Sequence, residues 1–246
     1  MPATPAWPPA SLPRLFVDEA LSQDQHLMID GAQAHYLAGV MRRKAGDQII
    51  LFDDRTGEWL ATIESVAKRN LVIHLTEKLR EREAVPDLWL VAAPIKKDRI
   101  DWVAEKASEL GVARWRPVIT HRTIVDRLNL DRLRSHMIEA AEQCERTALP
   151  LLDEPVKLAA LLREWPADRQ LIFADEEGGL PMVQAIRPGP AAILIGPEGG
   201  FTPEERAAIR AIPQASGISL GPRILRADTA TAAAIAVWMS HAGDWR

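Results

Sequence analysis

Two glycine-proline segments near the C-terminus decide the fold: Ile195-Gly196-Pro197-Glu198-Gly199-Gly200-Phe201-Thr202 and Leu220-Gly221-Pro222-Arg223-Ile224-Leu225-Arg226-Ala227-Asp228-Thr229-Ala230. Each segment follows a short apolar run and precedes a helical pattern, which is typical of a strand-to-helix turn in an α/β sheet. Glycines let a backbone approach a ligand closely, and open α/β sheets bind ligands at the carboxyl ends of their strands. We therefore predict one ligand pocket with both segments as its walls.

The C-terminal part of the chain alternates between strand and helix patterns, which favours a parallel sheet. Apolar runs predict strands over 88–93, 112–119, 171–174, 191–195 and 217–220. Amphipathic spacing predicts one helix capped by Asp98, a second over 131–146 with Cys144 on its buried stripe, and a third opened by a Thr202-Pro203-Glu205 capping box. An alanine-rich final helix is capped by Asp228 or Thr229, and its small residues allow close packing within the monomer or against a second subunit.

The N-terminal part has a different rhythm. Short alternating runs over 14–17, 25–29, 48–52, 58–66 and 71–75 are separated by turn compositions, which predicts a small antiparallel barrel or sheet. Helical spacing over 32–43 predicts one interrupting helix, and the charged stretch 78–87 is interpreted as a linker. We therefore expect two domains, 1–80 and 81–246.

Composition limits the class of protein. With 246 residues and 47% hydrophobic content, the chain can bury a sizeable core, and we expect neither a signal peptide nor a membrane span. A single cysteine excludes an internal disulfide and a multi-cysteine zinc site, which fits a reducing cytoplasm, and we expect no metal. The net charge of −4 argues against a uniformly basic nucleic-acid binder, yet residues 96–134 hold ten basic and six acidic side chains. Such a local basic stretch is compatible with a polyanionic substrate and equally with an ordinary solvated face.

The chemistry of the predicted pocket disfavours a nucleoside triphosphate. Glu198 and the acidic residues of the helix cap bring negative charge to the helix N-terminus, and no Lys-Ser/Thr pair follows as in a phosphate-binding loop. A ligand with a cationic centre and an adenine ring suits the glycines and the flanking Leu194, Ile195, Leu220 and Leu225 better.

Several motifs taken together resemble the ribosomal RNA small subunit methyltransferase E family. They are Ile195–Thr202, Leu220–Ala230, Lys96-Lys97, Glu105-Lys106, Glu109-Leu110-Gly111, Glu139–Arg146 and Tyr36–Phe52, so that the resemblance spans nearly the whole chain. It implies a SPOUT-type α/β domain with a trefoil knot after a PUA-like β-barrel. It also implies methylation of N3 of a uridine in 16S ribosomal RNA with S-adenosylmethionine, by a homodimer that acts on the assembled small subunit. One departure is Ala227-Asp228, where the family more often has Thr-Glu, and this puts a role for the side chain of residue 227 in doubt.

The resemblance implies three groups of site residues. The expected cofactor-binding residues are Leu194, Ile195, Gly196, Pro197, Glu198, Gly199, Gly200, Leu220, Gly221, Ile224, Leu225, Thr229 and Ala230. The expected RNA-binding residues are Arg42, Arg43, Lys44, Lys96, Lys97, Arg99, Arg122 and Arg146. The expected catalytic residues are Arg226, Asp228 and Glu198.

The chemistry of methyl transfer suggests roles for the three expected catalytic residues. Uracil N3 becomes a good nucleophile only after its proton leaves, and the Arg226 guanidinium is placed to stabilise the developing negative charge. Asp228 or Glu198 accepts the proton or orients Arg226, and the sequence does not choose between them. The alternative is a purely structural role for these residues: Arg226 would cap a carbonyl or pair with Glu198, and Arg146 would form a solvated helical ion pair with Glu142.

Two alternative functions follow from the same sequence. The first is a related SPOUT enzyme that methylates a ribose 2′-oxygen or another base. The second is an RNA-binding or assembly protein that keeps the pocket without turnover.

Overall fold

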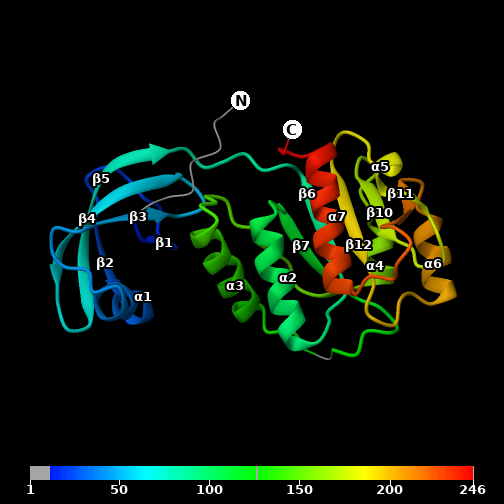
Figure 1. The fold of residues 1–246 in the computed structure, drawn as a ribbon, viewed down its shortest axis with the longest axis horizontal. Helices are drawn as coiled ribbons and strands as arrows, with labels where there is room; N and C mark the ends of the chain where they lie inside the picture. The colour runs from blue at the N-terminus through cyan, green and yellow to red at the C-terminus, as the bar shows by residue number, and fades with distance from the viewer. Residues whose placement is uncertain (1–11, 126, 246) are drawn as a thin grey trace. The chain divides into compact units, whose positions relative to one another are not determined.

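The computed structural model describes residues 12–125 and 127–245, which form two compact units. The first comprises residues 12–83 together with 145–148, and the second the remaining described residues of 84–144 and 149–245. Figure 1 shows the sheet of the first unit in blue and cyan and the helices and strands of the second from green to red. The described parts of the chain contain no helix with the length and apolar content that crossing a bilayer requires.

The first unit is built on one sheet. Its strands lie in the order β1 (Arg14–Phe16), β3 (Gln48–Phe52), β4 (Glu58–Val66), β5 (Asn70–Arg80) and β2 (His26–Asp30). Alternate residues face its core, as on β4, where Trp59, Ala61 and Ile63 are buried. The expectation of an antiparallel sheet is confirmed for β2 to β5 and wrong for β1, which pairs in parallel with β3.

The helix expected over 32–43 is shorter than predicted. An α-helix, α1 (Gly31–His35), continues as one π-helical turn, η1 (Tyr36–Val40), and Arg42 then adopts a left-handed φ of 54°. The apolar residues that gave this helical spacing are Tyr36, Leu37, Val40 and Met41, and of these only Leu37 is buried. The segment changes from α-helical to π-helical hydrogen bonding at Tyr36, which changes the rotation per residue, and periodicity alone does not reveal this change.

The second unit has a parallel sheet at its centre. The strand order is β11 (Leu180–Pro181), β13 (Ala215–Ser219), β10 (Gln170–Ala174), β12 (Ala191–Ile195), β6 (Leu88–Ala92), β7 (Arg114–Ile119) and β8 (Leu151–Leu152). β9 (Val156–Lys157) pairs separately with β7. All of these pairings are parallel, which confirms the α/β class.

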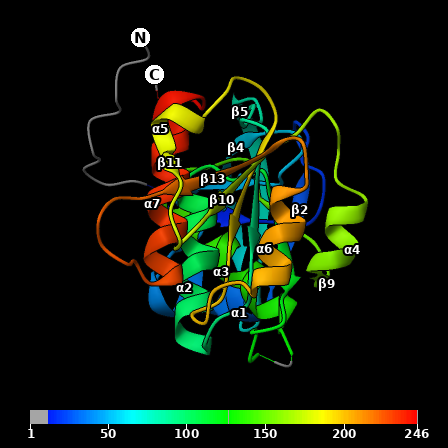
Figure 2. The ribbon, with the colours of Figure 1, turned by 90° about the vertical axis from the view of Figure 1, so that its right-hand side faces the viewer.

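Helices cover both faces of this sheet (Figure 2). On one face lie α2 (Lys97–Glu109), α3 (Leu130–Gln143), α5 (Met182–Ala185) and α7 (Ala227–His241), and on the other α4 (Leu158–Arg163) and α6 (Pro203–Arg210). Strand β12 contributes side chains to the hydrophobic cores on both faces of the sheet. Ile193 packs in the core on the α7 side, and Leu194 packs in the core on the α6 side. The alanines of α7 give it a close fit, since Ala234 is fully buried within this unit.

Three helix ends differ from the sequence-based expectations. Helix α2 has Lys96 rather than Asp98 at its N-cap position, and α7 has Arg226 rather than Asp228 or Thr229. Helix α3 ends at Gln143, so Cys144 lies beyond the buried stripe and is exposed. The capping box of α6 is confirmed: the Thr202 side chain accepts from the Glu205 N–H, and the Glu205 side chain accepts from the Thr202 N–H.

Candidate functional site

The two glycine-proline segments meet because their strands are close together in the sheet. Strands β13, β10 and β12 are adjacent and parallel, so the loops that follow their carboxyl ends share one edge. These loops surround a hollow of about 570 Å³. Its lining runs through Ala174–Glu176, Gly178, 195–200, 218–227 and Ala230. The prediction of a single pocket with both segments as its walls is therefore confirmed.

Glycine is required where the Gly196–Thr202 loop turns back against the neighbouring loop. Gly200 has a φ of +66°, and a Cβ at this position would lie 2.2 Å from Oε1 of Glu176. A hydrogen bond from the Gly200 N–H to the Pro197 carbonyl, 2.8 Å long, closes the turn. The absence of a side chain at residue 200 thus leaves room for a carboxylate at the wall of the hollow.

A buried guanidinium joins two of the three loops. Arg206 on α6 donates to Asp175 and, over 2.9 Å, to Glu176, both of which follow β10. It also donates over 3.4 Å to the carbonyl of Phe201 in the glycine-rich loop. The side chains of Arg206 and Asp175 are only 5% and 1% exposed, and Arg210, one helical turn further on, donates to the second oxygen of Asp175 over 2.6 Å.

The charge of this cluster is well defined. Burial acts to lower the pKa of Arg206, but the hydrogen bonds and negative charges of Glu176 and Asp175 outweigh burial and raise this pKa above its ordinary value. The guanidinium is therefore a permanent cation, and it holds two acidic side chains of the lining, Asp175 and Glu176.

The three expected catalytic residues occupy different environments. Arg226 and Glu198 both line the hollow, and neither side chain has a hydrogen-bond or ion-pair partner among the described residues. Asp228 lies outside the lining: its Oδ1 accepts from the Thr229 N–H at 2.8 Å, and its Oδ2 lies 3.7 Å from Nε of Arg99. The alternative pairing of Arg226 with Glu198 is absent from the described residues.

Most of the expected cofactor-binding residues line the hollow. Two do not: Leu194 is fully buried in the core on the α6 side, and Thr229 lies on α7 outside the lining. The loop after β10, with Asp175, Glu176 and Gly178, was missed. The signal for it was the run Asp175-Glu176-Glu177-Gly178-Gly179 directly after a buried strand, but that run lacks the proline of the other two loops.

The expected RNA-binding residues fall into several settings. In the first unit, Arg42 and Lys44 are exposed and Arg43 is half-buried after η1. In the second unit, Lys96 is exposed at the start of α2, and Lys97 is its first residue. Arg99 lies beside Asp228, as described above.

Two of these residues have internal partners instead. Arg122 donates over 2.6 Å to the carbonyl of Gly199, so it supports the glycine-rich loop from behind. Arg146 belongs to the first unit, where it is only 5% exposed and its Nε lies 3.5 Å from Glu83. Because the chain leaves α3 at Gln143, the expected helical position of Arg146 is wrong, and its burial disfavours contact with RNA.

Comparison with protein families gives two matches. A family described as an RNA methyltransferase domain matches residues 81–239, and one described as an RNA methyltransferase PUA domain matches residues 29–76. The ribosomal RNA small subunit methyltransferase E of Rickettsia conorii is 31% identical over 229 residues, which cover 91% of this chain and 93% of that protein. The protein of the same name from Bacillus subtilis is 28% identical, over 82% of this chain and 85% of its own.

Solved structures agree with these matches. A putative methyltransferase from Legionella pneumophila in complex with S-adenosylmethionine has a TM-score of 0.86 and 30% identity, and the alignment covers 96% of this chain and 100% of that chain. A ribosomal RNA small subunit methyltransferase E from Neisseria gonorrhoeae bound to S-adenosylmethionine has a TM-score of 0.88 and 26% identity, with the same coverage. With its PUA-like first unit and α/β second unit, the chain belongs to the ribosomal RNA small subunit methyltransferase E family of SPOUT methyltransferases.

Proposed function

We propose that this protein transfers a methyl group from S-adenosylmethionine to N3 of a uridine in 16S ribosomal RNA. The observation that carries this proposal is the hollow formed by three loops, in a chain whose structural relatives from Legionella and Neisseria bind that cofactor. The resemblance to the methyltransferase family supports the finer parts of the proposal. These are methylation at N3, the assembled small subunit as substrate, the homodimer, the cytoplasmic location and the knotted path of the chain.

The residues present fit the cofactor. The glycine positions let the backbone come close to a ligand, and a Cβ at Gly200 would lie 2.2 Å from a carboxylate oxygen of Glu176. Ile195 and Ile218, 3% and 1% exposed, are apolar residues of the lining, which suits an adenine ring. Glu198, which has no partner among the described residues, adds negative charge that suits a ligand with a sulfonium and an ammonium group.

When bound, S-adenosylmethionine supplies an electrophilic methyl group. The chain must align the uracil N3 behind that group, and positioning of this kind supplies much of the rate in transfer reactions. Arg226 stabilises the negative charge that develops on the base, because its guanidinium lines the hollow without an internal anion to neutralise it.

We assign proton acceptance at N3 to Glu198 rather than to Asp228. The Glu198 carboxylate lines the hollow and has no internal partner among the described residues, whereas Asp228 accepts from the Thr229 N–H and lies beside Arg99. The oxygens of Asp228 are thus engaged outside the lining, whereas those of Glu198 are available to a proton donor that enters the hollow.

A second copy of the chain would cover apolar side chains that are otherwise exposed. Ile224, on the second glycine-proline loop, is 95% exposed although it lines the hollow. Burying it in a subunit interface would link dimer formation to the shape of the hollow. Sedimentation of the Ile224→Ser variant tests this part: a monomer supports it, and an unchanged dimer contradicts it.

Mass spectrometry of nucleosides tests the reaction. Ribosomal RNA from cells that lack the protein should contain no N3-methyluridine at the target, and the wild-type gene should restore it. Glu198→Gln should fail to restore it, whereas Asp228→Asn should restore it in large part. Loss of a 2′-O-methyl nucleoside or of another methylated base would refute the N3 assignment, and an unchanged nucleoside content together with cofactor binding would favour an assembly role.

A further inference from the structure

A second hollow lies in the first unit. It has a volume of about 610 Å³ and lies between the α1–η1 segment and the turn that joins β4 to β5. Glycines and alanines form much of its wall. The lining comprises Asp30, Gly31, Ala34, His35, Ala38, Gly39, Ala67, Lys68, Arg69 and Asn70.

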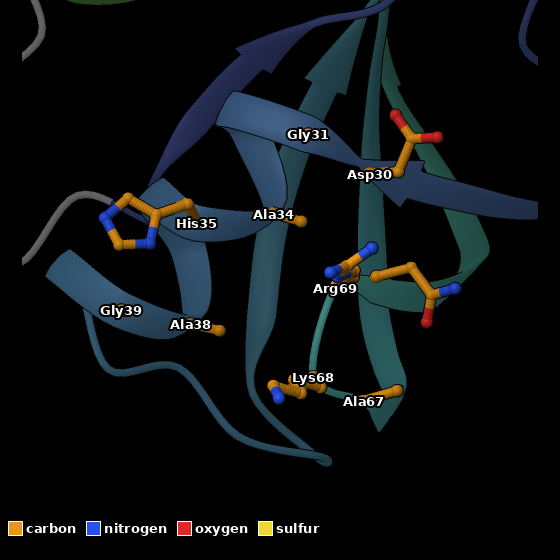
Figure 3. A pocket seen from close by; sticks show the side chains of 10 residues that line it. Asp30, Gly31, Ala34, His35, Ala38, Gly39, Ala67, Lys68 and Arg69 are labelled. Atoms are coloured by element: carbon orange, nitrogen blue, oxygen red, sulfur yellow. The ribbon is translucent and has the colours of Figure 1, made fainter.

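Two cationic side chains, Lys68 and Arg69, border this hollow. In Figure 3, Ala34 and Ala38 point from the helical segment toward Arg69 across the gap, and Lys68 lies at the lower rim. His35 and the carboxylate of Asp30 point away from these alanines. The lining thus carries one acidic residue, Asp30, whose carboxylate points away from the alanines, and two basic residues, Lys68 and Arg69.

Neither cation is used within the protein. Among the described residues, the exposed side chains of Lys68 and Arg69 have no hydrogen-bond or ion-pair partner. The turn that carries them is held by its own backbone, since the Ala67 N–H donates to the Asn70 carbonyl over 2.9 Å. Its position is thus defined while its charge is free to meet an external anion.

We propose that this hollow binds one unpaired nucleotide of the RNA substrate and that Lys68 and Arg69 hold its phosphate. This inference rests on the proposed function, because it gives the substrate a second contact in the first unit. The alanine and glycine wall offers a surface on which a planar base can pack without a side chain in the way. The Asn70 Nδ2 donates one N–H to Met28 Sδ over 3.6 Å, which leaves its second N–H and its carbonyl oxygen for a base edge.

The charge and the family match favour RNA over other anions. All ten lining residues fall within 29–76, the range that matches the RNA methyltransferase PUA domain. Arg42 and Lys44 follow Gly39 closely in the sequence and are exposed. A single-stranded RNA segment that enters the hollow therefore has further cations nearby along the protein chain. A backbone phosphate between two free cations gives the charge-assisted hydrogen bonds that dominate RNA affinity.

Two variants of the full-length protein test the proposal separately. The double variant Lys68→Gln/Arg69→Gln removes the phosphate contacts, and Ala38→Leu fills the hollow while it keeps every charge. The matched control is Arg55→Gln, because Arg55 is an exposed arginine of the same unit that does not line the hollow and has no side-chain partner among the described residues.

Binding is measured with small ribosomal subunits from the deletion strain and with a mixed-sequence single-stranded RNA of twelve nucleotides. Both hollow variants should weaken RNA binding about tenfold, the effect of about 1.4 kcal/mol. Affinity falls as salt rises, so the slope of log affinity against log salt concentration is negative. Only the double variant should make this slope less steep, by about 0.7 for each phosphate that the protein no longer neutralises. Arg55→Gln should change affinity less than about twofold.

The outcomes separate this inference from the proposed function. Affinity for S-adenosylmethionine, measured by calorimetry, should be the same in all variants, and circular dichroism should show that they fold. Wild-type affinity for both RNA probes in Ala38→Leu and in the double variant overturns the inference, even if the wild-type protein methylates ribosomal RNA. An equal loss of RNA affinity in Arg55→Gln also overturns it, because the effect would then be one of net charge. Absence of methyl transfer by the wild-type protein, by contrast, refutes the proposed function.

Discussion

Replacing Arg206 by glutamine gives the strongest test of how the cofactor hollow is built. The wild-type guanidinium donates to Asp175, to Glu176 and to the carbonyl of Phe201, so one side chain joins the loop after β10 to the loop after β12. Glutamine is shorter and uncharged, and it cannot reach both loops. The change therefore removes the link between them without altering any residue that lines the hollow.

The structure sets the size of the effect. Removal of one partner from a buried ion pair costs about 3–5 kcal/mol, because the other charge stays buried without compensation. Asp175 is 1% exposed, but it keeps Arg210 at 2.6 Å, so we expect the lower end, about 3 kcal/mol of unfolding free energy. Separation of the two loops should also raise the Kd for S-adenosylmethionine about tenfold, the effect of about 1.4 kcal/mol.

Two assays and one matched control check this prediction. Urea unfolding gives the free energy of unfolding, and calorimetry gives the cofactor affinity of the folded protein. Arg210→Gln is the control: Arg210 pairs with the same carboxylate, but its side chain is 50% exposed and its hydrogen bond reaches only the loop after β10. This control should lose less than about 1 kcal/mol of stability and keep its cofactor affinity.

A specific result would refute the reasoning. If Arg206→Gln unfolds at the wild-type urea concentration and binds the cofactor with wild-type affinity, the buried cluster neither stabilises the second unit nor positions its loops. If stability falls but affinity does not, the cluster supports the fold only. Arg206→Lys separates charge from geometry, since lysine keeps the charge but cannot make the forked contacts to two loops.

Three further predictions follow from single residues. Gly200→Ala should lose about 1–2 kcal/mol of stability, because alanine resists a φ of +66°. The variant should also bind the cofactor more weakly, because the new Cβ displaces Glu176. Wild-type cofactor affinity in calorimetry would contradict this second expectation. Arg226→Lys should lower kcat about tenfold or more with little change in RNA affinity, since lysine lacks the planar fork, and near-normal turnover in a methyl-transfer assay would exclude the proposed role. Burial acts to raise the pKa of Asp53, but the N–H groups of Leu21, Thr56 and Arg55 and the Thr56 hydroxyl outweigh burial and hold this pKa below the usual 3.8. The stability that the Asp53 carboxylate contributes is therefore present above pH 3.8. It is lost as the pH falls through the lower pKa of the folded state. Asp53→Asn should therefore cost about 2 kcal/mol at pH 7 and less at low pH, and urea unfolding at several pH values would disprove this if the difference were constant.

Local patterns in the sequence were sufficient for much of the second unit. The strands over 191–195 and 171–174 were predicted to within one residue, because a buried parallel strand is a continuous apolar run bounded by turn residues. The capping box at Thr202 was also predicted, since both of its hydrogen bonds form within four successive residues. These features depend on interactions between near neighbours in the chain.

The features that were missed depend on residues far apart in the sequence. Asp175 and Arg206 are separated by 31 positions, and only the adjacency of β10 and β12 brings their loops into contact. Strand β1 pairs in parallel with β3, which a row of short alternating strands does not reveal. Arg146 lies in the first unit although it follows a helix of the second, so a charge pattern interpreted as helical led to the wrong surroundings.

By itself, the sequence determined the α/β class, the parallel strands of the second unit and the two glycine-proline loops that share a hollow, because hydrophobic periodicity and turn chemistry are local properties. Tertiary structure alone decided that a third loop, with Asp175 and Glu176, completes that hollow, and that among the described residues Glu198 has no partner while Asp228 is engaged. It also decided that Lys68 and Arg69 stand beside a second hollow in the first unit. The physical reason is that the order of strands in a sheet, and the partner that each buried charge finds, follow from the packing of the whole chain.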